Sequence, residues 1–335
     1  MLDKPSLEME ELYHRVISGA GFINQKVDAL FLQGSDCIDF LNRLSTNDLK
    51  GLSECQCRTT VLTNEKGRII DIATIFYQGE SYLLIVSLHN GQRVKNWLEK
   101  FIIMEDVLVV GVFTDVELIA CLGSQTHLAL SNIMGIQEVP WSDNFINVVF
   151  NNRNLICYKD TKWQMPIFYI FEPQNLKSIL LPEFMNIASV RSNIDIINPN
   201  VFEIMRVEQG IPILGKEITE QINPLEARLN KYISFSKGCY IGQEIIARLD
   251  SYNKLQRQLS GFIYDQTPNK PFGTGKLFIE NKEVGWTTSI SWSYKINQWI
   301  TLGYLKTSLG CDHIDLIENS SNEKYLLKVV DIPFE

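Results

Sequence analysis

Hydrophobic residues, many of them β-branched, group into short stretches between turn-forming residues in the first third of the chain. This pattern is typical of strands. A turn at residues 64–67 separates two of these stretches, so we expect a β-hairpin there. The elements predicted in this region are strands at 57–63, 68–77, 81–87 and 106–113, and a helix that begins after Asn90. Their order, β-β-β-α-β, predicts a compact α+β unit of the ferredoxin-like kind.

Apolar residues recur at helical spacing in three other regions, of which the first is residues 7–18. The second follows Ser35, which we expect to be the N-cap of a helix that carries Phe40. The third begins after Asn198-Pro199 and ends at Gly210, because proline suits the first turn of a helix and glycine suits its end.

Strands with glycine turns between them dominate the rest of the chain. After Arg257 they are short and closely spaced, which predicts a small all-β barrel. The strands expected in this barrel are 259–264, 275–280, 284–291, 299–305 and 325–331. Further strands are expected at 27–33, 117–122, 145–150, 155–158 and 166–171.

Residues 232–248 combine a strand pattern with a helix pattern. Residues 232–236 alternate as a strand, and residues 243–248 are expected to form a short helix. Cys239 would then lie in the corner between the two, where the N–H groups of a helix start and the nearby Lys237 favour a thiolate. The alternative is that Cys239 is a small buried hydrophobic residue, as most free cysteines are.

The composition is that of an ordinary globular protein, with 45% hydrophobic and 21% charged residues in a chain of 335. A formal net charge of -8 argues against direct nucleic-acid binding, which requires a basic surface. Apolar runs stay below the roughly 18 residues that a membrane helix needs. Acidic residues also stand near the N-terminus, where a signal peptide would be apolar. We therefore expect a cytoplasmic protein without a membrane partner.

The seven cysteines are an odd number in a large chain, which argues against a disulfide framework. No C-x-x-C pair occurs, and the four histidines are scattered along the sequence. We therefore expect reduced thiols and no metal bound by this chain alone.

The segment from Lys237 to Glu244, continued by Arg248, resembles the K-G-C-[FY]-x-G-Q-E motif of the YgfZ family. That family consists of folate-binding relatives of the glycine cleavage T-protein that support iron-sulfur enzymes. The resemblance implies that Cys239 is a functional thiol with Lys237 beside it. The other residues that match the motif are Gly238, Tyr240, Gly242, Gln243, Glu244 and Arg248.

Two more segments resemble this family and imply folate contacts. The stretch that leads to Asn47 and Asp48 resembles the family's opening motif, although both residues also form turns readily. Asp71 matches the first aspartate of the T-protein sequence G-G-x-[IL]-D-D, which lies near the reactive N5 of tetrahydrofolate, whereas the second aspartate is replaced by Ile72. The alternative for Asp71 is a structural hydrogen bond at the end of a strand.

The segment 205–215 resembles the family's R-x-E-x-G-x-P sequence, which implies that Arg206 and Glu208 line a folate pocket. A carboxylate can accept two N–H bonds from the pterin ring. Glu208 also stands in the last turn of its predicted helix, where the helix dipole disfavours a negative charge. The alternative is an ion pair with Arg206 or Arg228.

Together these resemblances imply a T-protein-like α+β fold with two interleaved α/β domains, a ferredoxin-like unit and a C-terminal β-barrel. We expect a folate-binding core at 1–50, 115–170 and 195–255, a ferredoxin-like domain at 51–114 and 171–194, and a barrel at 256–335. The implied function is to support assembly or repair of iron-sulfur clusters in client enzymes, including radical enzymes that modify tRNA, with tetrahydrofolate or another folate as cofactor. The expected partners are folate and client iron-sulfur proteins or cluster-assembly factors. The alternative is a folate-dependent aminomethyltransferase, and the sequence leaves open whether the chain is an enzyme.

Overall fold

The computed structural model describes residues 4–79, 81–136, 144–176, 180, 182–186, 194–251, 255–265, 274–307, 309, 313–318 and 324–335. Two compact units make up the chain, and each is formed by segments that are separate in the sequence. The barrel unit contains Met1–His14, Asn198–Leu229 and Ile246–Glu335, and the sheet unit contains Arg15–Ile197 and Asn230–Ile245. The domain boundaries expected from the sequence stay a prediction.

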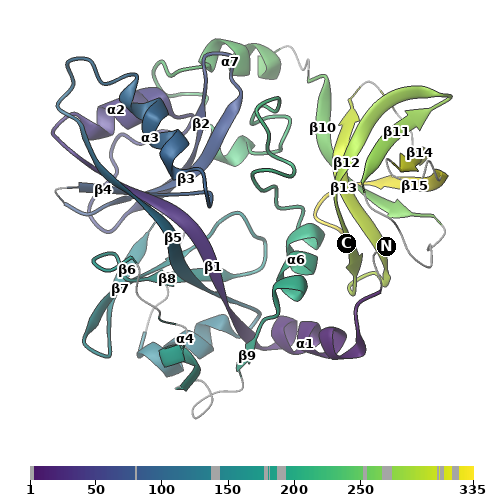
Figure 1. Cartoon of the computed structure of the whole chain (residues 1–335), viewed down its shortest axis with the longest axis horizontal. Helices are drawn as coiled ribbons and strands as arrows, with labels where there is room; N and C mark the ends of the chain where they lie inside the picture. Colours follow the sequence, from purple (N-terminus) through teal and green to yellow (C-terminus); the bar gives the residue numbers. More distant parts are fainter. Residues whose placement is uncertain are drawn as a thin grey trace. The chain divides into compact units, whose positions relative to one another are not determined.

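The sheet unit is built on one nine-stranded sheet (Figure 1). Its strand order is β2-β3-β4-β1-β5-β8-β7-β6, and β9 pairs with β1 in parallel. The strands are β1 (Ala20–Gln33), β2 (Cys57–Thr63), β3 (Ile69–Tyr77), β4 (Ser81–Val86), β5 (Leu108–Leu122), β6 (Phe145–Phe150), β7 (Arg153–Lys159), β8 (Ile167–Phe171) and β9 (Ile194–Ile196). The predicted hairpin is confirmed, because β2 and β3 pair in antiparallel fashion.

Two predictions in this unit were wrong in detail. The strands expected at 106–113 and 117–122 are one long strand, β5, because it pairs along β1 with two register shifts that keep the pairing continuous. Ser35 is not an N-cap, since Asp36 precedes the helix α2 (Cys37–Leu44). The Ser35 hydroxyl instead donates to the Asp106 carboxylate at 2.9 Å.

Helices cover the faces of this sheet by burying apolar stripes. Helix α2 and helix α3 (Gly91–Glu99) pack Phe40, Trp97 and their apolar neighbours into one cluster with residues of β1, β3 and β4. Helix α4 (Thr126–Met134) packs Leu130 and Ile133 into a second cluster with β5, β7 and β8. The C-terminal residues of α2, among them Leu41 and Leu44, are therefore buried against the sheet.

The barrel unit is a closed barrel with the strand order β10-β13-β12-β11-β14-β15, so the predicted barrel is confirmed (Figure 1). Its strands are β10 (Arg257–Tyr264), β11 (Gly275–Ile279), β12 (Lys282–Ser293), β13 (Gln298–Lys306), β14 (His313–Glu318) and β15 (Lys324–Val330). The sequence pattern missed β14. Helix α6 (Pro199–Glu208) packs on β12 and β13, and its N-cap is Asn198 as expected.

Residues 232–236 do not form the strand that their alternation predicted. A short 3-10 helix, η1 (Asn230–Tyr232), is followed by bends, because this segment bonds to the turn after α2 instead of joining the sheet. The Ser234 N–H donates to the Thr46 carbonyl at 2.9 Å, and the Thr46 hydroxyl donates to the Tyr232 carbonyl at 2.6 Å. The helix expected at 243–248 is confirmed as α7 (Gln243–Ser251). The first helix of the chain is α1 (Leu7–Ser18), with the bounds that the sequence predicted.

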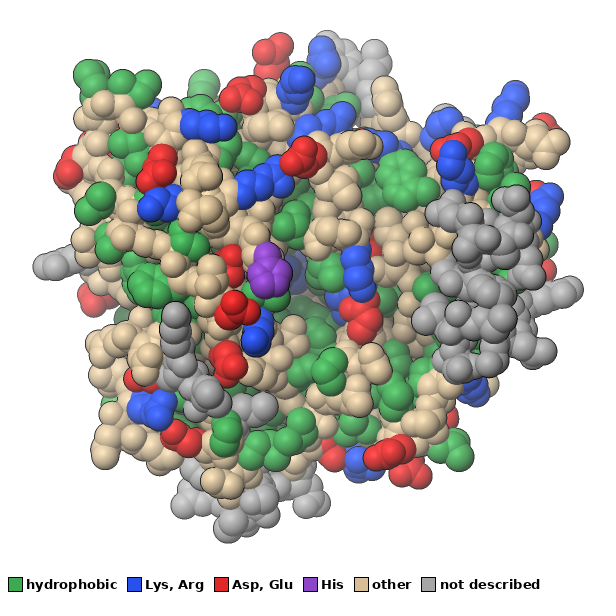
Figure 2. All heavy atoms as spheres, in the orientation of Figure 1, with side chains coloured by type: hydrophobic (Ala, Val, Ile, Leu, Met, Phe, Trp, Pro, Cys, Tyr) green, Lys and Arg blue, Asp and Glu red, His purple; other side chains and the backbone are tan. Residues whose placement is uncertain are grey.

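The surface mixes both signs of charge. Figure 2 shows acidic and basic side chains next to one another on the face it presents, in keeping with a net charge of -8. Among the described residues, no helix combines the length and apolar character needed to cross a bilayer.

Candidate functional site

The loop that carries Cys239 is fastened to the C-terminal end of α2 by a buried lysine. The Lys237 ammonium donates to the backbone carbonyls of Asn42 at 2.7 Å, Ser45 at 2.9 Å and Asn47 at 2.5 Å. These carbonyls lie in and just beyond the last turn of the helix, where a positive charge complements the helix dipole. Lys237 therefore joins two segments that lie about 190 residues apart along the chain.

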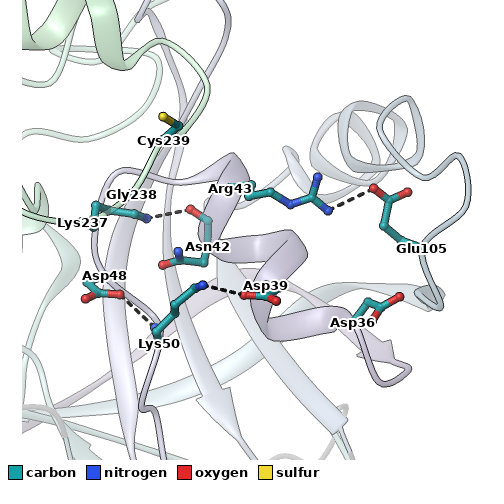
Figure 3. A pocket seen from close by; sticks show the side chains of 10 residues that line it. All are labelled: Asp36, Asp39, Asn42, Arg43, Asp48, Lys50, Glu105, Lys237, Gly238 and Cys239. Atoms are coloured by element: carbon teal, nitrogen blue, oxygen red, sulfur yellow. Dashed lines mark hydrogen bonds and ion pairs between the residues drawn. The ribbon is translucent and has the colours of Figure 1, made fainter.

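This arrangement changes the role that the sequence suggested for Lys237. Burial lowers the pKa of its ammonium to about 8, the Asp48 charge opposes that shift, and the Lys50 charge adds to it. In Figure 3 the ammonium points toward Asn42, whereas the sulfur of Cys239 points away from it. In this structure Lys237 fixes the backbone of the loop, and it does not contact the sulfur.

The other end of the loop is fixed by a glycine. Gly242 has φ +81°, and a Cβ atom there would lie 2.6 Å from the Asn64 carbonyl oxygen. The preceding residue, Ile241, donates its N–H to the Arg43 carbonyl at 2.9 Å and accepts the Thr63 hydroxyl at 2.9 Å. No other residue type fits at position 242 without moving the β2–β3 turn.

Between these two attachments, Cys239 is exposed. It lies at the edge of a cavity of about 570 Å³ in the sheet unit (Figure 3). Ion pairs inside this cavity join Arg43 to Glu105 at 3.0 Å and Lys50 to Asp39 at 3.1 Å. The residues that line the cavity are Asp36, Asp39, Asn42, Arg43, Asp48, Lys50, Glu105, Lys237, Gly238 and Cys239. Cys239 thus lies at the rim of a polar cavity, and its sulfur points away from the other lining residues and is exposed.

The remaining motif residues support the loop or lie on the surface. Tyr240 is buried, which raises its pKa to about 12, and its ring centre lies 5.2 Å from the Lys237 ammonium. The Gln243 side chain accepts the Tyr240 N–H at 3.4 Å. Glu244 and Arg248 are exposed on α7.

Asn47 uses its side chain within its own turn. Its amide donates to the Thr59 carbonyl at 2.8 Å and accepts the Asp48 N–H at 2.9 Å. These are the bonds expected of a turn-forming asparagine. A folate contact by the Asn47 side chain stays a prediction.

Asp71 is fully buried, and protein groups occupy its carboxylate completely. One oxygen accepts the Ile72 N–H and the Ser87 hydroxyl, at 2.7 and 2.6 Å. The other accepts the Ser87 N–H and the Asn90 amide, at 3.1 and 2.7 Å. Burial raises the pKa of Asp71, and these four bonds counteract the rise. Asp71 ties β3 to the start of α3, and it does not line the cavity at Cys239.

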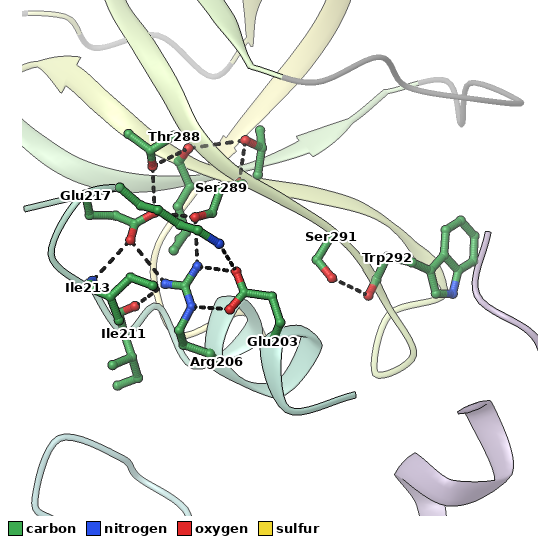
Figure 4. A network of polar contacts seen from close by, with 12 residues as sticks. Glu203, Arg206, Ile211, Ile213, Glu217, Thr288, Ser289, Ser291 and Trp292 are labelled. Atoms are coloured by element: carbon green, nitrogen blue, oxygen red, sulfur yellow. Dashed lines mark hydrogen bonds and ion pairs between the residues drawn. The ribbon is translucent and has the colours of Figure 1, made fainter. Parts of the chain in front are cut away.

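Arg206 lies in a buried network of charges in the barrel unit (Figure 4). It makes a two-bond ion pair with Glu203, with both distances 2.7 Å, and a second ion pair with Glu217 at 3.1 Å. Burial lowers the pKa of Arg206, but the two carboxylates outweigh burial and raise it. Ser289 of β12 accepts from Arg206 and donates to Glu217, so the network fastens α6 to the barrel.

Glu208 belongs to a separate network, although it stands only two residues from Arg206. One of its oxygens accepts the Ser293 hydroxyl at 2.6 Å and the Lys295 N–H at 3.2 Å. The other accepts the Tyr13 hydroxyl at 2.7 Å. Burial, together with the charge and the hydrogen bond of Glu208, raises the pKa of Tyr13. Neither alternative ion pair of Glu208 is present among the described residues, because Arg206 pairs with Glu203 and Glu217, and Arg228 pairs with Asp331.

The structure thus brings some of the predicted site residues together and engages others in separate hydrogen-bond networks. Lys237, Gly238 and Cys239 meet at the end of α2, while Asp71, Arg206 and Glu208 each have a network of their own. Sequence analysis missed Tyr13, Glu217 and Ser293, because Tyr13 and Ser293 are 195 and 85 residues away from Glu208 and no spacing rule connects them. Among the described residues, no group of three or more His, Cys, Asp and Glu side chains is arranged to hold a metal ion.

Comparisons with known proteins agree with this architecture. Residues 10–148 match the GCVT N-terminal domain, and residues 257–334 match the glycine cleavage T-protein C-terminal barrel domain. An aminomethyltransferase of Pelodictyon phaeoclathratiforme is 27% identical over 285 residues, which cover 83% of this chain and 76% of that protein. One of Aquifex aeolicus is 25% identical over 268 residues, covering 79% and 70%.

A solved structure confirms the predicted fold class. The crystal structure of the glycine cleavage system aminomethyltransferase T from Bartonella henselae superimposes with a TM-score of 0.82. The match covers 100% of this chain and 91% of that one, at 17% sequence identity. The chain therefore has the T-protein fold, with a GCVT N-terminal domain followed by a glycine cleavage T-protein C-terminal barrel domain.

Proposed function

We propose that this chain is a folate-binding accessory protein that supports assembly or repair of iron-sulfur clusters in client enzymes, including radical enzymes that modify tRNA. The observation that supports this most is the exposed thiol of Cys239 on a loop whose backbone is fixed at both ends. A thiolate is the ligand by which proteins bind iron-sulfur clusters. A fixed, open cysteine is therefore suited to meet the sulfur or iron chemistry of a client.

Folate binding is supported by the two T-protein domains and by the chemistry of Glu208. Among the described residues, the Glu208 oxygen that accepts from Tyr13 has one hydrogen-bond donor, so it keeps acceptor capacity for an N–H group of a pterin ring. Asp71 has no such capacity, because two donors already occupy each of its oxygens. A folate contact by Asp71 would require Ser87 or Asn90 to release it. Arg206 would act by holding α6 in place.

Calorimetric titration with tetrahydrofolate tests the folate part of the proposal. We expect measurable binding, and we expect Glu208→Gln to weaken it by about 1 to 3 kcal/mol, the cost of a mismatched buried polar partner. Glu203→Gln is the matched control, because Glu203 lies on the same helix and faces Arg206. The absence of heat at millimolar folate would mean that the protein has the T-protein fold but does not bind folate.

Complementation tests the part played by the thiol. In cells that lack the protein, we expect Cys239→Ala to bind folate normally and to fail to restore the activity of an iron-sulfur enzyme. Cys55→Ala is the matched control, because Cys55 is also an exposed free cysteine of the sheet unit. Full restoration by Cys239→Ala would remove the thiol from the function.

A folate-dependent one-carbon transferase is the second candidate, and the names of the relatives favour it. Three departures from the T-protein sequence weigh against it. Ile72 replaces the second aspartate, Gln243 stands where T-proteins usually have arginine, and residues 158–163 replace the G-Y-T-G-E loop. Formation of methylene-tetrahydrofolate from an aminomethyl donor by the purified protein would favour this candidate over the accessory role.

A further inference from the structure

The loop between α3 and β5 presents two large apolar side chains to solvent. Ile103 is 84% exposed and Met104 is 92% exposed, the highest values among the exposed large hydrophobic residues of the described chain. Leu108 and Val110, at the start of β5, are also more than half exposed. Single exposed apolar residues are common, but a contiguous exposed group marks an interaction surface. We call Ile103 and Met104 the apolar tip.

The backbone of this tip is held rigidly. One oxygen of the Glu105 carboxylate accepts the N–H groups of Ile103 and Met104 at 2.9 and 3.1 Å, and the other accepts from Arg43 at 3.0 Å. The N–H bond from Ile103 is the largest of the causes that lower the pKa of Glu105 to about 2, and the Arg43 bond follows. The carboxylate therefore stays charged and keeps these bonds at any physiological pH. A surface that is fixed before binding loses less entropy when a partner binds.

The apolar tip borders the cavity of the Cys239 thiol. Glu105 and Arg43 line that cavity together with Cys239, and Figure 3 shows their ion pair beside the α2 helix. A protein bound on the tip would therefore lie beside the cavity at whose rim Cys239 lies. The tip and the thiol belong to the same compact unit, so their proximity does not depend on the barrel unit.

The charges around the tip indicate the chemistry of its partner. Asp36 and Asp106 are exposed, and neither forms an ion pair with a described residue, whereas Arg43 and Lys50 are each paired with a carboxylate. Lys100, just after α3, is exposed as well, so two carboxylates are opposed by one ammonium and the border is acidic on balance. Hydrogen bonds from Ser35 lower the pKa of Asp106, so this carboxylate is charged. An acidic border repels anionic lipid head groups and attracts basic side chains. These charges favour a protein partner over a membrane.

We propose that the apolar tip is the docking surface for the client protein, whose complementary surface is an apolar recess bordered by lysine or arginine. This inference rests on the proposed function, because it identifies where a client binds for its reacting group to reach Cys239. The tip supplies affinity, and the exposed position of Cys239 leaves the sulfur open to the client.

Substitution of both tip residues tests the proposal in cells that lack the protein. We expect Ile103→Asp combined with Met104→Asp to reduce restored iron-sulfur enzyme activity at least tenfold, while folate binding and the alkylation rate of Cys239 stay unchanged. Val149→Asp is the matched control, since Val149 is 71% exposed on β6 of the same unit. Full restoration by the tip variant would overturn the docking proposal. Restoration by Cys239→Ala would instead overturn the proposed function. A loss of restored activity in the tip variant would in that case still show that a client binds at the tip.

Site-specific photocrosslinking identifies the partner directly. With p-benzoylphenylalanine at position 104 or 149, we expect an adduct with an iron-sulfur protein at 104 alone, and we expect Asp36→Lys to reduce it severalfold. An adduct of twice the chain's mass would mean that a second copy covers the tip, and it would overturn the proposal. Binding of the purified protein to phosphatidylserine vesicles through the tip would overturn it as well.

Discussion

The Cys239 loop and the end of helix α6 use buried charged groups for opposite purposes. In the loop, the Lys237 ammonium binds three backbone carbonyls, and the side chain between the two fixed ends stays exposed. In α6, the charged atoms of Arg206 and Glu208 are engaged by partners of the same unit, and both side chains are buried. The first arrangement leaves a reactive thiol open to solvent, whereas the second uses Arg206 to fasten α6 to the barrel and leaves acceptor capacity on one Glu208 oxygen. Burial and hydrogen-bond partners therefore separate residues that a motif alone ranks together.

The largest expected effect concerns the α6 network. We expect Arg206→Met to lower the free energy of unfolding by about 3 to 5 kcal/mol, because it leaves the fully buried Glu217 without its ion-pair partner. Urea denaturation of the purified protein measures this loss. Lys216→Met is the control, since Lys216 pairs with Glu203 near the surface, and its loss should cost at most about 1 kcal/mol. If Arg206→Met lowered the free energy of unfolding by no more than the Lys216→Met control does, the network would not stabilise α6.

A pair of glycines gives the next effect. We expect Gly242→Ala to destabilise the protein by about 1 to 3 kcal/mol, because of its positive φ and its contact with the Asn64 carbonyl. Gly238→Ala should change stability by less than about 0.5 kcal/mol, since a Cβ atom at position 238 meets no atom within 4 Å. Equal effects at the two positions, measured by denaturation, would contradict the constraint placed on this loop.

The smallest effect is a dependence on pH that Lys237 should produce. Its pKa is about 8 in the folded protein, below the ordinary value of 10.5 expected in the unfolded chain. Between these values the unfolded chain binds more protons, so the contribution of Lys237 to stability rises with pH across this window and is constant below it. The difference in free energy of unfolding between the wild type and Lys237→Met should therefore grow from pH 8 to 10. A difference that does not change over this range would place the ammonium in solvent, and a difference that shrinks would mean that its bonds to the carbonyls outweigh burial.

The sequence predicted elements best where local pattern and tertiary pairing agree. The β2–β3 hairpin, α1, α7 and most barrel strands were expected because their periodicity matches the face they bury. Residues 232–236 have a strand pattern, but their hydrogen bonds to the turn after α2 replaced sheet pairing. Alternation was right about the burial of Ile233, but Phe235, on the same predicted face, is 51% exposed, and Tyr232, on the opposite face, is buried.

The candidate site was predictable only in part. The motif identified Cys239 and Lys237, because glycine, lysine and cysteine at this spacing are unusual for packing alone. The motif could not show that the Lys237 ammonium binds the end of α2. The three carbonyls lie far away in the sequence, and every residue type has a backbone carbonyl, so residue identity does not reveal these bonds. The partners of Glu208 were hidden for the same reason, because Tyr13 and Ser293 are ordinary residues until the fold brings them together.

The most direct test of the central claim, that the loop is built to keep the Cys239 thiol open, is to measure how fast each cysteine of the native protein is alkylated. Iodoacetamide labelling read by mass spectrometry should modify Cys239 and Cys55 rapidly, and it should leave Cys37, Cys57, Cys121 and Cys157 unmodified until the protein unfolds. Protection of Cys239 at the level of the buried Cys157 would contradict the account.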